Sequence, residues 1–201
     1  RAERGQERRL RSDLAALRLC VPERSEGMSD LAERIAGLLR DVPDFPQPGI
    51  LFKDITPLLA DAEAFDAVIH GLAALADVPV DIVAGIEARG FLVAGALARQ
   101  LGCGLVPVRK AGKLPPPTIS RSYDLEYGSA TVEVPVGILS GRRVLLVDDV
   151  LATGGTLRAA AELIAEAGGT VVGMGVIVEL GFLGGRAALD GLAPFEALLT
   201  L

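Results

Sequence analysis

Short apolar runs alternate along the chain with longer segments in which apolar residues recur every three or four positions. Runs of a length typical of buried strands occupy residues 80–85, 103–108, 144–147 and 170–178. Helical spacing covers residues 31–39, 61–76, 91–101 and 157–167. Two more strands are predicted at 130–136 and 195–201, the last at a sheet edge. Strands that alternate with helices predict an α/β fold with a doubly wound, mainly parallel sheet flanked by helices.

Two segments cannot continue these elements, because prolines interrupt them. Three prolines hold residues 41–49 in extended or turn conformations, and residues 50–57 then supply a strand's worth of backbone around Phe52. Residues 109–122 are basic and then proline-rich, so we expect a long mobile loop. Because long loops often close over a site, we expect a lid hairpin over about 109–130.

The first residues differ from the rest of the chain in composition. They are rich in arginine and acidic residues, and Met28 precedes an amphipathic helix that Ser29 or Asp30 can cap. We therefore expect residues 1–28 to be an N-terminal extension, either disordered or the product of a mis-assigned start. A helix packed on the domain is the open alternative. Residues 29–201 are expected to form a single domain.

Composition excludes several classes of protein. Half of the residues are apolar and few are aromatic, as in parallel sheets covered by helices. The net charge of −6 argues against a nucleic-acid partner. No apolar run approaches the ~18 residues that a membrane span needs. Cys20 and Cys103 form no disulfide or metal pattern, which favours the reducing cytoplasm.

The strongest chemical signal is the end of the strand predicted at 144–147. Asp148 and Asp149 follow it directly, and a loop of small residues then begins a helix. Glycines allow backbone to approach a ligand, and a helix N-terminus offers unpaired N–H groups to an anion. Paired carboxylates beside a phosphate site suit a ligand with vicinal hydroxyls or a divalent metal, such as a sugar phosphate. The alternative is a Rossmann-type strand with a solvated acidic end.

This stretch resembles the phosphoribosyl pyrophosphate (PRPP) motif of type I phosphoribosyltransferases. The resemblance implies the type I phosphoribosyltransferase fold, with a small N-terminal hood at about 29–60. It also implies that Asp148 and Asp149 hold the ribose hydroxyls. It implies a 5′-phosphate cradle formed by Ala152, Thr153, Gly154, Gly155 and Thr156. A Walker B strand is the other resemblance, but the chain has no G-x-x-x-x-G-K-[ST] loop, so a P-loop nucleotidase is excluded.

Residues 50–57 resemble the hood of adenine phosphoribosyltransferases. The resemblance implies that Phe52 stacks on the purine and that main-chain groups near Leu51 and Lys53 recognise its edge. Lys53 replaces an arginine that is common there. From the residues alone, a core aromatic is the favoured interpretation of Phe52.

A second anion site is expected where the strand at 80–85 meets the helix at 91–101. The resemblance implies a pyrophosphate loop formed by Glu87, Ala88, Arg89 and Gly90, with Arg89 also acting in catalysis. It adds Arg109 and Lys113 as pyrophosphate ligands, with Lys113 reaching a neighbouring subunit. A surface Arg89 paired with Glu87 is the alternative.

Residues 125–128, Leu-Glu-Tyr-Gly, are similar to a segment that distinguishes the adenine-using enzymes. The resemblance implies that Glu126 and Tyr127 come over the bound substrate. Glu126 would then be the catalytic group that orients a ring nitrogen of adenine or exchanges a proton with it, and Tyr127 would contact the base. The alternative for Glu126 is an exposed loop acid.

Together these motifs imply a purine-salvage enzyme that converts adenine and PRPP to AMP and pyrophosphate through an oxocarbenium-like transition state. Mg²⁺ would be held mainly by PRPP, with no direct protein ligand, and the enzyme would be a cytoplasmic homodimer. Enzymes for 6-oxopurines carry an acid where this chain has Ala152, which favours adenine. The alternative is a PRPP-sensing regulator without catalysis, which the acidic charge and Glu126 oppose.

Overall fold

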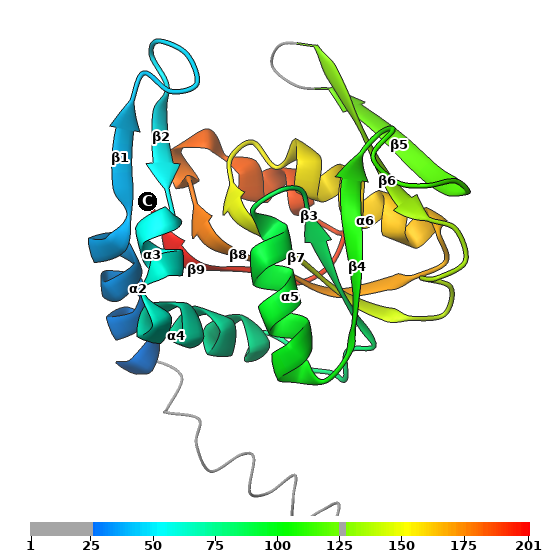
Figure 1. Ribbon diagram of the computed structural model, residues 1–201, viewed down its shortest axis with the longest axis horizontal. Coiled ribbons are helices and arrows are strands. Elements are labelled where there is room, and N and C mark those ends of the chain that lie inside the picture. The colour runs from blue at the N-terminus through cyan, green and yellow to red at the C-terminus, as the bar shows by residue number, and fades with distance from the viewer. Residues whose placement is uncertain (1–25, 125–127) are drawn as a thin grey trace, which may run out of the picture.

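The computed structural model describes residues 26–124 and 128–201 and contains a large and a small sheet (Figure 1). The strands are β1 (Arg40–Pro43), β2 (Leu51–Asp54), β3 (Ile82–Ile86), β4 (Gly104–Lys110), β5 (Thr118–Asp124), β6 (Ser129–Pro135), β7 (Arg143–Leu151), β8 (Thr170–Glu179) and β9 (Phe195–Thr200). The helices are α2 (Glu26–Leu38), α3 (Thr56–Ala60), α4 (Ala62–Ala73), α5 (Gly90–Leu101) and α6 (Gly155–Glu166), with two 3₁₀ helices, η2 (Gly181–Leu183) and η3 (Gly185–Leu189). Most of the extension expected at 1–28 lies outside the described residues.

The large sheet has the strand order β5-β6-β4-β3-β7-β8-β9. Five neighbouring strands are mutually parallel, in the order β4, β3, β7, β8 and β9. Strands β5 and β6 add an antiparallel hairpin at one edge, and β9 forms the other edge. The doubly wound, mainly parallel sheet predicted from the sequence is therefore confirmed. Strands β1 and β2 pair separately as an antiparallel ribbon, beside the carboxyl ends of the large sheet (Figure 1).

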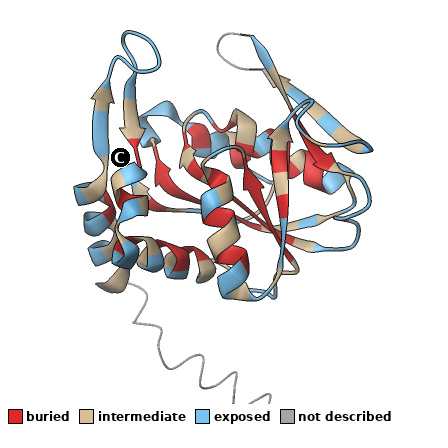
Figure 2. Cartoon of the chain, in the orientation of Figure 1, coloured by how far each residue is buried: buried red, intermediate tan, exposed pale blue. Residues whose placement is uncertain are grey.

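Helices cover both faces of the sheet because the central strands are apolar on both sides. On β7, Val144 and Leu146 pack in one cluster with α6, whereas Leu145 and Val147 pack in a second cluster with α2, α4 and α5. Buried residues accordingly follow the middle of the sheet and the inner faces of the helices (Figure 2). In the described part of the chain, no helix is both long and apolar enough for a membrane span.

The expected cap of the first helix is wrong. The helix begins at Glu26 rather than after Ser29 or Asp30, so both residues lie within α2. Residues 26–28 contain no proline, so they can form the first turn of the helix ahead of Ser29. Its apolar face is as expected, with Ile35 fully buried against the second cluster.

The long loop expected at 109–122 is also wrong, because β4 continues to Lys110 and residues 118–124 form strand β5. Alternate residues of β5 face α6: Ile119 and Tyr123 pack against the core, and Arg121 forms ion pairs with Glu162 and Glu166. The alternation of polar and partly apolar residues after the prolines is a strand pattern that the basic and proline-rich composition obscured.

Candidate functional site

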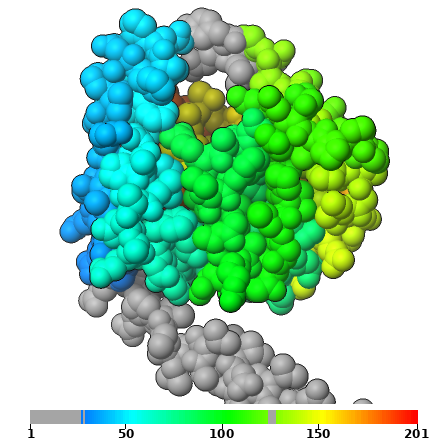
Figure 3. Space-filling model, viewed as in Figure 1, coloured from blue at the N-terminus to red at the C-terminus, as the bar shows by residue number. Residues whose placement is uncertain are grey.

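The site lies where neighbouring strands β3 and β7 end. The chain leaves β3 for β4 on one side of the sheet, and β7 is followed by β8 on the other side. Ligands of doubly wound proteins bind at such a switch point. Figure 3 shows a hollow in this part of the molecule, between the blue β1–β2 ribbon and the green surface of the β4–β5 side.

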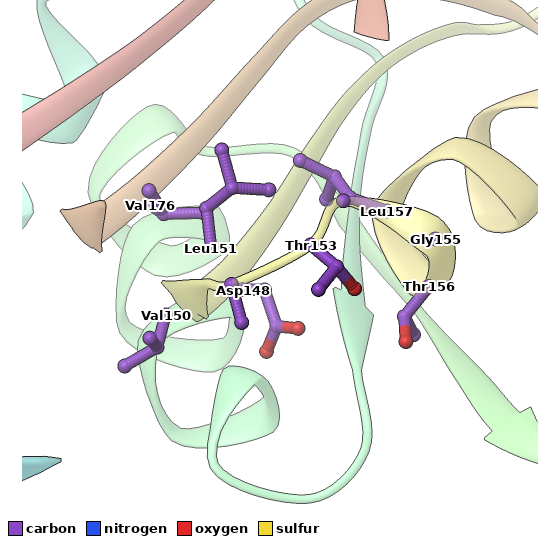
Figure 4. Close-up of a pocket in the computed structure, with 10 residues that line it drawn as sticks. Asp148, Val150, Leu151, Thr153, Gly155, Thr156, Leu157 and Val176 are labelled. Carbon is purple, nitrogen blue, oxygen red and sulfur yellow. The ribbon is translucent and has the colours of Figure 1, made fainter. Parts of the chain in front are cut away.

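Residues of the predicted phosphate motif line a pocket at the end of β7 (Figure 4). The strand itself runs to Leu151, so the acidic pair lies within β7 rather than beyond it. Asp148, Thr153 and Thr156 present oxygen atoms along one side of the loop (Figure 4). The remaining lining residues are Val150, Leu151, Ala152, Gly154, Gly155, Leu157 and Val176.

The first turn of α6 is open to an anion. Its N-cap is Gly154, which has a φ of 84° and offers no side chain to cap the helix. The first helical hydrogen bond to the cap comes from the Arg158 N–H, which leaves the N–H groups of residues 155–157 without a helical partner. These unpaired N–H groups and the helix dipole favour a phosphate at this position.

A second loop packs behind the predicted phosphate loop (residues 152–156), and no sequence pattern predicted this contact. A Cβ on Gly185 would lie 2.0 Å from the Ala152 carbonyl oxygen, and one on Gly154 would lie 2.4 Å from the Gly185 carbonyl oxygen. Arg186 fixes this second loop through its ion pair with buried Glu179, whose Oε2 lies 2.6 Å from Nη2. The adjacent glycines 184 and 185 were the only sequence signal for this contact.

Asp148 lies between the starts of α5 and α6. Burial raises the pKa of this carboxyl well above its usual value, and the neighbouring charge of Asp149 raises it further. Its Oδ1 accepts a hydrogen bond from the Asp149 N–H at 2.9 Å. A Cβ on Gly90 would lie 2.7 Å from this same oxygen, so only glycine fits at the start of α5. The pyrophosphate-loop and phosphate-motif residues are thus in direct contact.

Arg89 connects three parts of the site. Its Nη2 forms an ion pair with Asp149 Oδ2 at 2.8 Å, and its guanidinium carbon lies 4.8 Å from the centre of the Phe52 ring. The alternative pairing of Arg89 with Glu87 is therefore not observed. Its Nη1 is buried without a hydrogen-bond partner among the described residues, and Asp149 Oδ2 accepts no hydrogen bond there. A buried, unpaired guanidinium nitrogen suits an anionic ligand.

The β1–β2 ribbon carries the residues expected to contact the base. Phe52 is half-buried, belongs to neither core cluster and meets Phe45 edge to face at 5.1 Å. It is therefore not the core aromatic that composition alone allowed. Leu51 is exposed, and Lys53 pairs with Asp41 through a 2.6 Å contact.

Glu87 connects the turn after β3 to β4. Its Oε2 accepts hydrogen bonds from Arg109 Nε and the Lys110 N–H, both at 3.1 Å, and Arg109 Nη1 donates to the Lys113 carbonyl at 2.9 Å. The Glu87–Ala88 peptide bond is cis. The Lys113 N–H donates in turn to Glu133, a buried carboxylate that the sequence reasoning missed.

Two of the expected site residues, Glu126 and Tyr127, lie outside the described residues. The sequence reasoning also missed a contact of the other tyrosine: the Tyr123 hydroxyl of β5 lies 3.0 Å from Thr156 Oγ1. Within residues 26–124 and 128–201, no group of three or more histidine, cysteine, aspartate or glutamate side chains could hold a metal ion.

Known proteins are similar to this chain in sequence and in fold. Residues 58–185 match the family model described as a phosphoribosyl transferase domain. Adenine phosphoribosyltransferase of Frankia casuarinae is 56% identical over 185 residues, which cover 90% of this chain and 97% of the relative. The structure of adenine phosphoribosyltransferase from Rhodothermus marinus matches with a TM-score of 0.82 and 45% identity, over 86% of this chain and 99% of that one. The Saccharomyces cerevisiae enzyme, complexed with adenine and an imino-altritol bisphosphate, matches with a TM-score of 0.78 and 39% identity, over 85% and 99% of the chains.

Proposed function

The chain belongs to the phosphoribosyltransferase family, as an adenine phosphoribosyltransferase, and from this premise we propose how its own residues convert adenine and PRPP to AMP and pyrophosphate in purine salvage. The main supporting observation is that two anion sites flank the acidic pair of β7. One site is the open first turn of α6, and the other is the Arg89 guanidinium, which pairs with Asp149 and whose Nη1 lacks a partner among the described residues.

The phosphate motif would hold the phosphoribosyl group. Backbone N–H groups of residues 152–156, with the Thr153 and Thr156 hydroxyls, would bind the 5′-phosphate, and Asp148 and Asp149 would accept hydrogen bonds from the ribose hydroxyls. Burial and the charge of Asp149 raise the pKa of Asp148. Hydrogen bonds from the ribose hydroxyls would stabilise the ionised carboxylate and so lower this pKa on binding.

The turn after β3 would hold the leaving pyrophosphate. Arg89 would donate Nη1 to it, and the loop residues Glu87, Ala88 and Gly90 would place Arg89 and shape the site. Arg109 and Lys113 would add positive charge, although Arg109 is engaged by Glu87 and the Lys113 carbonyl in this structure. Mg²⁺ bound to PRPP would neutralise the pyrophosphate further.

The hood would hold adenine. The half-buried Phe52 ring offers a surface on which the purine can stack, and backbone groups of exposed Leu51 and of Lys53 can recognise its edge. Ala152 leaves the phosphate loop without the acid that 6-oxopurine enzymes carry, which supports the choice of adenine over hypoxanthine or guanine.

The remaining roles rest on the sequence resemblance. Glu126 would orient a ring nitrogen of adenine or exchange a proton with it, and Tyr127 would contact the base. No protein nucleophile is required, because positioning and charge stabilisation lower the barrier to an oxocarbenium-like transition state. We further propose that residues 29–201 act as one domain, with a hood and a lid, in a cytoplasmic homodimer in which Lys113 reaches the neighbouring active site.

An AMP-formation assay tests this function directly. Adenine, hypoxanthine, guanine and orotate are compared with PRPP and Mg²⁺, and EDTA is added in a parallel series. We expect AMP and pyrophosphate from adenine alone, with loss of activity in EDTA and recovery with Mg²⁺. A regulator that binds PRPP without turnover would release no pyrophosphate with any base. The relatives named above are all enzymes, which does not favour this alternative.

A further inference from the structure

Tyr123 lies on the strand that packs beside the phosphate loop. Its ring packs against the core cluster that contains α6 residues, and its hydroxyl oxygen lies 3.0 Å from Oγ1 of Thr156 in the first turn of α6. Two residues earlier on the same face of β5, Arg121 forms ion pairs with Glu162 and Glu166 of α6. The end of β5 is thus fixed against the helix that begins at the phosphate loop.

The hydrogen-bonding capacity of the two hydroxyls assigns a direction to this contact. Each hydroxyl has one proton to donate and lone pairs to accept with, and either oxygen could be the donor in the free protein. A phosphate dianion only accepts hydrogen bonds. When Thr156 donates its one proton to a phosphate, the Tyr123 hydroxyl must therefore be the donor to Thr156 Oγ1.

We propose that Tyr123 is a positioning residue for the substrate phosphate: its hydroxyl donates to Thr156 Oγ1 and so directs the Thr156 proton into the phosphate pocket. This inference rests on the placement of the 5′-phosphate under the proposed function. Thr156 lines the pocket, whereas Tyr123 does not, so Tyr123 acts through Thr156 and not on the ligand itself. A donor chain of this kind also polarises the second hydrogen bond, which strengthens the contact with the phosphate.

The chain offers a matched pair of substitutions. Tyr123→Phe keeps the packed ring and removes only the hydroxyl. Ser122→Ala also removes one hydroxyl from β5, because Ser122 Oγ lies 2.8 Å from Thr131 Oγ1 on the neighbouring strand, at an exposed position away from the pocket. If losing a hydroxyl pair of β5 affected only the structure, both variants should show the same effect.

The test measures the affinity for ribose 5-phosphate and AMP by calorimetry, the KM values for PRPP and adenine, and the Tm. We expect Tyr123→Phe to weaken ribose 5-phosphate and AMP binding and to raise the KM for PRPP by roughly 3- to 10-fold, the effect of one hydrogen bond. The KM for adenine and the Tm should stay unchanged, and Ser122→Ala should change none of these values. In a Thr156→Val background, Tyr123→Phe should have no additional effect.

Equal ribose 5-phosphate affinity in Tyr123→Phe and the wild type would overturn the inference, as would equal effects on the KM values for PRPP and adenine. Additive effects of Tyr123→Phe and Thr156→Val would also overturn it. Failure of the proposed function is distinguishable, because a wild-type protein that makes no AMP from adenine and PRPP can still bind ribose 5-phosphate. A wild type that binds no ribose 5-phosphate would overturn both.

Discussion

Arg89 and Asp149 form an ion pair between two neighbouring strand ends, with Nη2 and Oδ2 2.8 Å apart. Arg89 follows β3 and Asp149 lies on β7, while the Phe52 ring of the hood rests against the same guanidinium. The proposed sites for pyrophosphate, ribose and base therefore meet at one side chain. Substitutions around it should separate their contributions.

Arg89→Lys should lower kcat/KM for PRPP by about 100-fold. Arginine pairs with Asp149 through Nη2 and still has Nη1 to donate to an anion. Lysine keeps the charge but lacks this planar pair of donors. Steady-state kinetics at varied PRPP measure this, with Arg99→Lys as the control, since Arg99 is exposed in the last turn of α5. A change of less than threefold would contradict the role of the fork.

Asp148→Asn should make the protein more stable at pH 7 and less active. Burial raises the pKa of Asp148 in the fold above its ordinary value of 3.8, so the folded protein binds this proton more tightly than the unfolded chain does. The stability that the protonated carboxyl contributes is fully present below the ordinary pKa of 3.8 and is lost as the pH rises through the raised pKa of the folded state. Asparagine keeps a neutral group and the acceptor for the Asp149 N–H.

Thermal unfolding at pH 7 and pH 4 measures this difference. We expect Asp148→Asn to raise the Tm by roughly 2–4 °C at pH 7, as ~1 kcal/mol does in a protein of this size, with a smaller gain at pH 4. Turnover should fall at least about tenfold, because the ribose loses a charged acceptor. Asp190→Asn, at an exposed position, is the control. A gain in Tm that does not depend on pH would argue against the burial of an ionised Asp148.

Phe52→Leu should raise the KM for adenine by about tenfold, because leucine offers no flat aromatic surface for stacking. The KM for PRPP should change less than threefold, although Arg89 loses its contact with the ring. Phe182→Leu is the control at a phenylalanine that is 76% exposed on η2. If PRPP and adenine were affected equally, Phe52 would serve mainly to support Arg89.

Gly185→Ala should disable the phosphate loop without unfolding the protein. The new Cβ would lie 2.0 Å from the Ala152 carbonyl oxygen and 3.0 Å from the Gly154 nitrogen, so the loop must move. We expect kcat/KM for PRPP to fall by about 100-fold, and the free energy of unfolding to fall by about 1–3 kcal/mol. Gly95→Ala is the control, since nothing lies within 4 Å of its added Cβ. Retained PRPP affinity in Gly185→Ala would show that the loop tolerates displacement.

The sequence predicted what depends on local pattern. The apolar runs of β3, β7 and β8 and the glycine loop after Asp149 carry their signals within a few residues. Contacts between distant segments left no such local signal. The partner of Arg89 could not be inferred, because it depends on the pairing of β3 with β7. The requirement for glycine at 185 could not be inferred either, since it comes from the distant Ala152 carbonyl. Strand β5 was missed because Arg121 and its polar neighbours conceal the partly buried face that packs on α6.

The lack of a side chain at Gly90 has a consequence for protein engineering. Since Gly85 pairs with Val147, the sheet itself aligns the turn after β3 with the acidic pair on β7, and a Cβ on Gly90 would lie 2.7 Å from Asp148 Oδ1. A one-residue insertion into either strand would shift one half of the proposed site against the other. Grafting this chemistry onto another scaffold therefore requires both strands and their mutual alignment, rather than the phosphate loop alone.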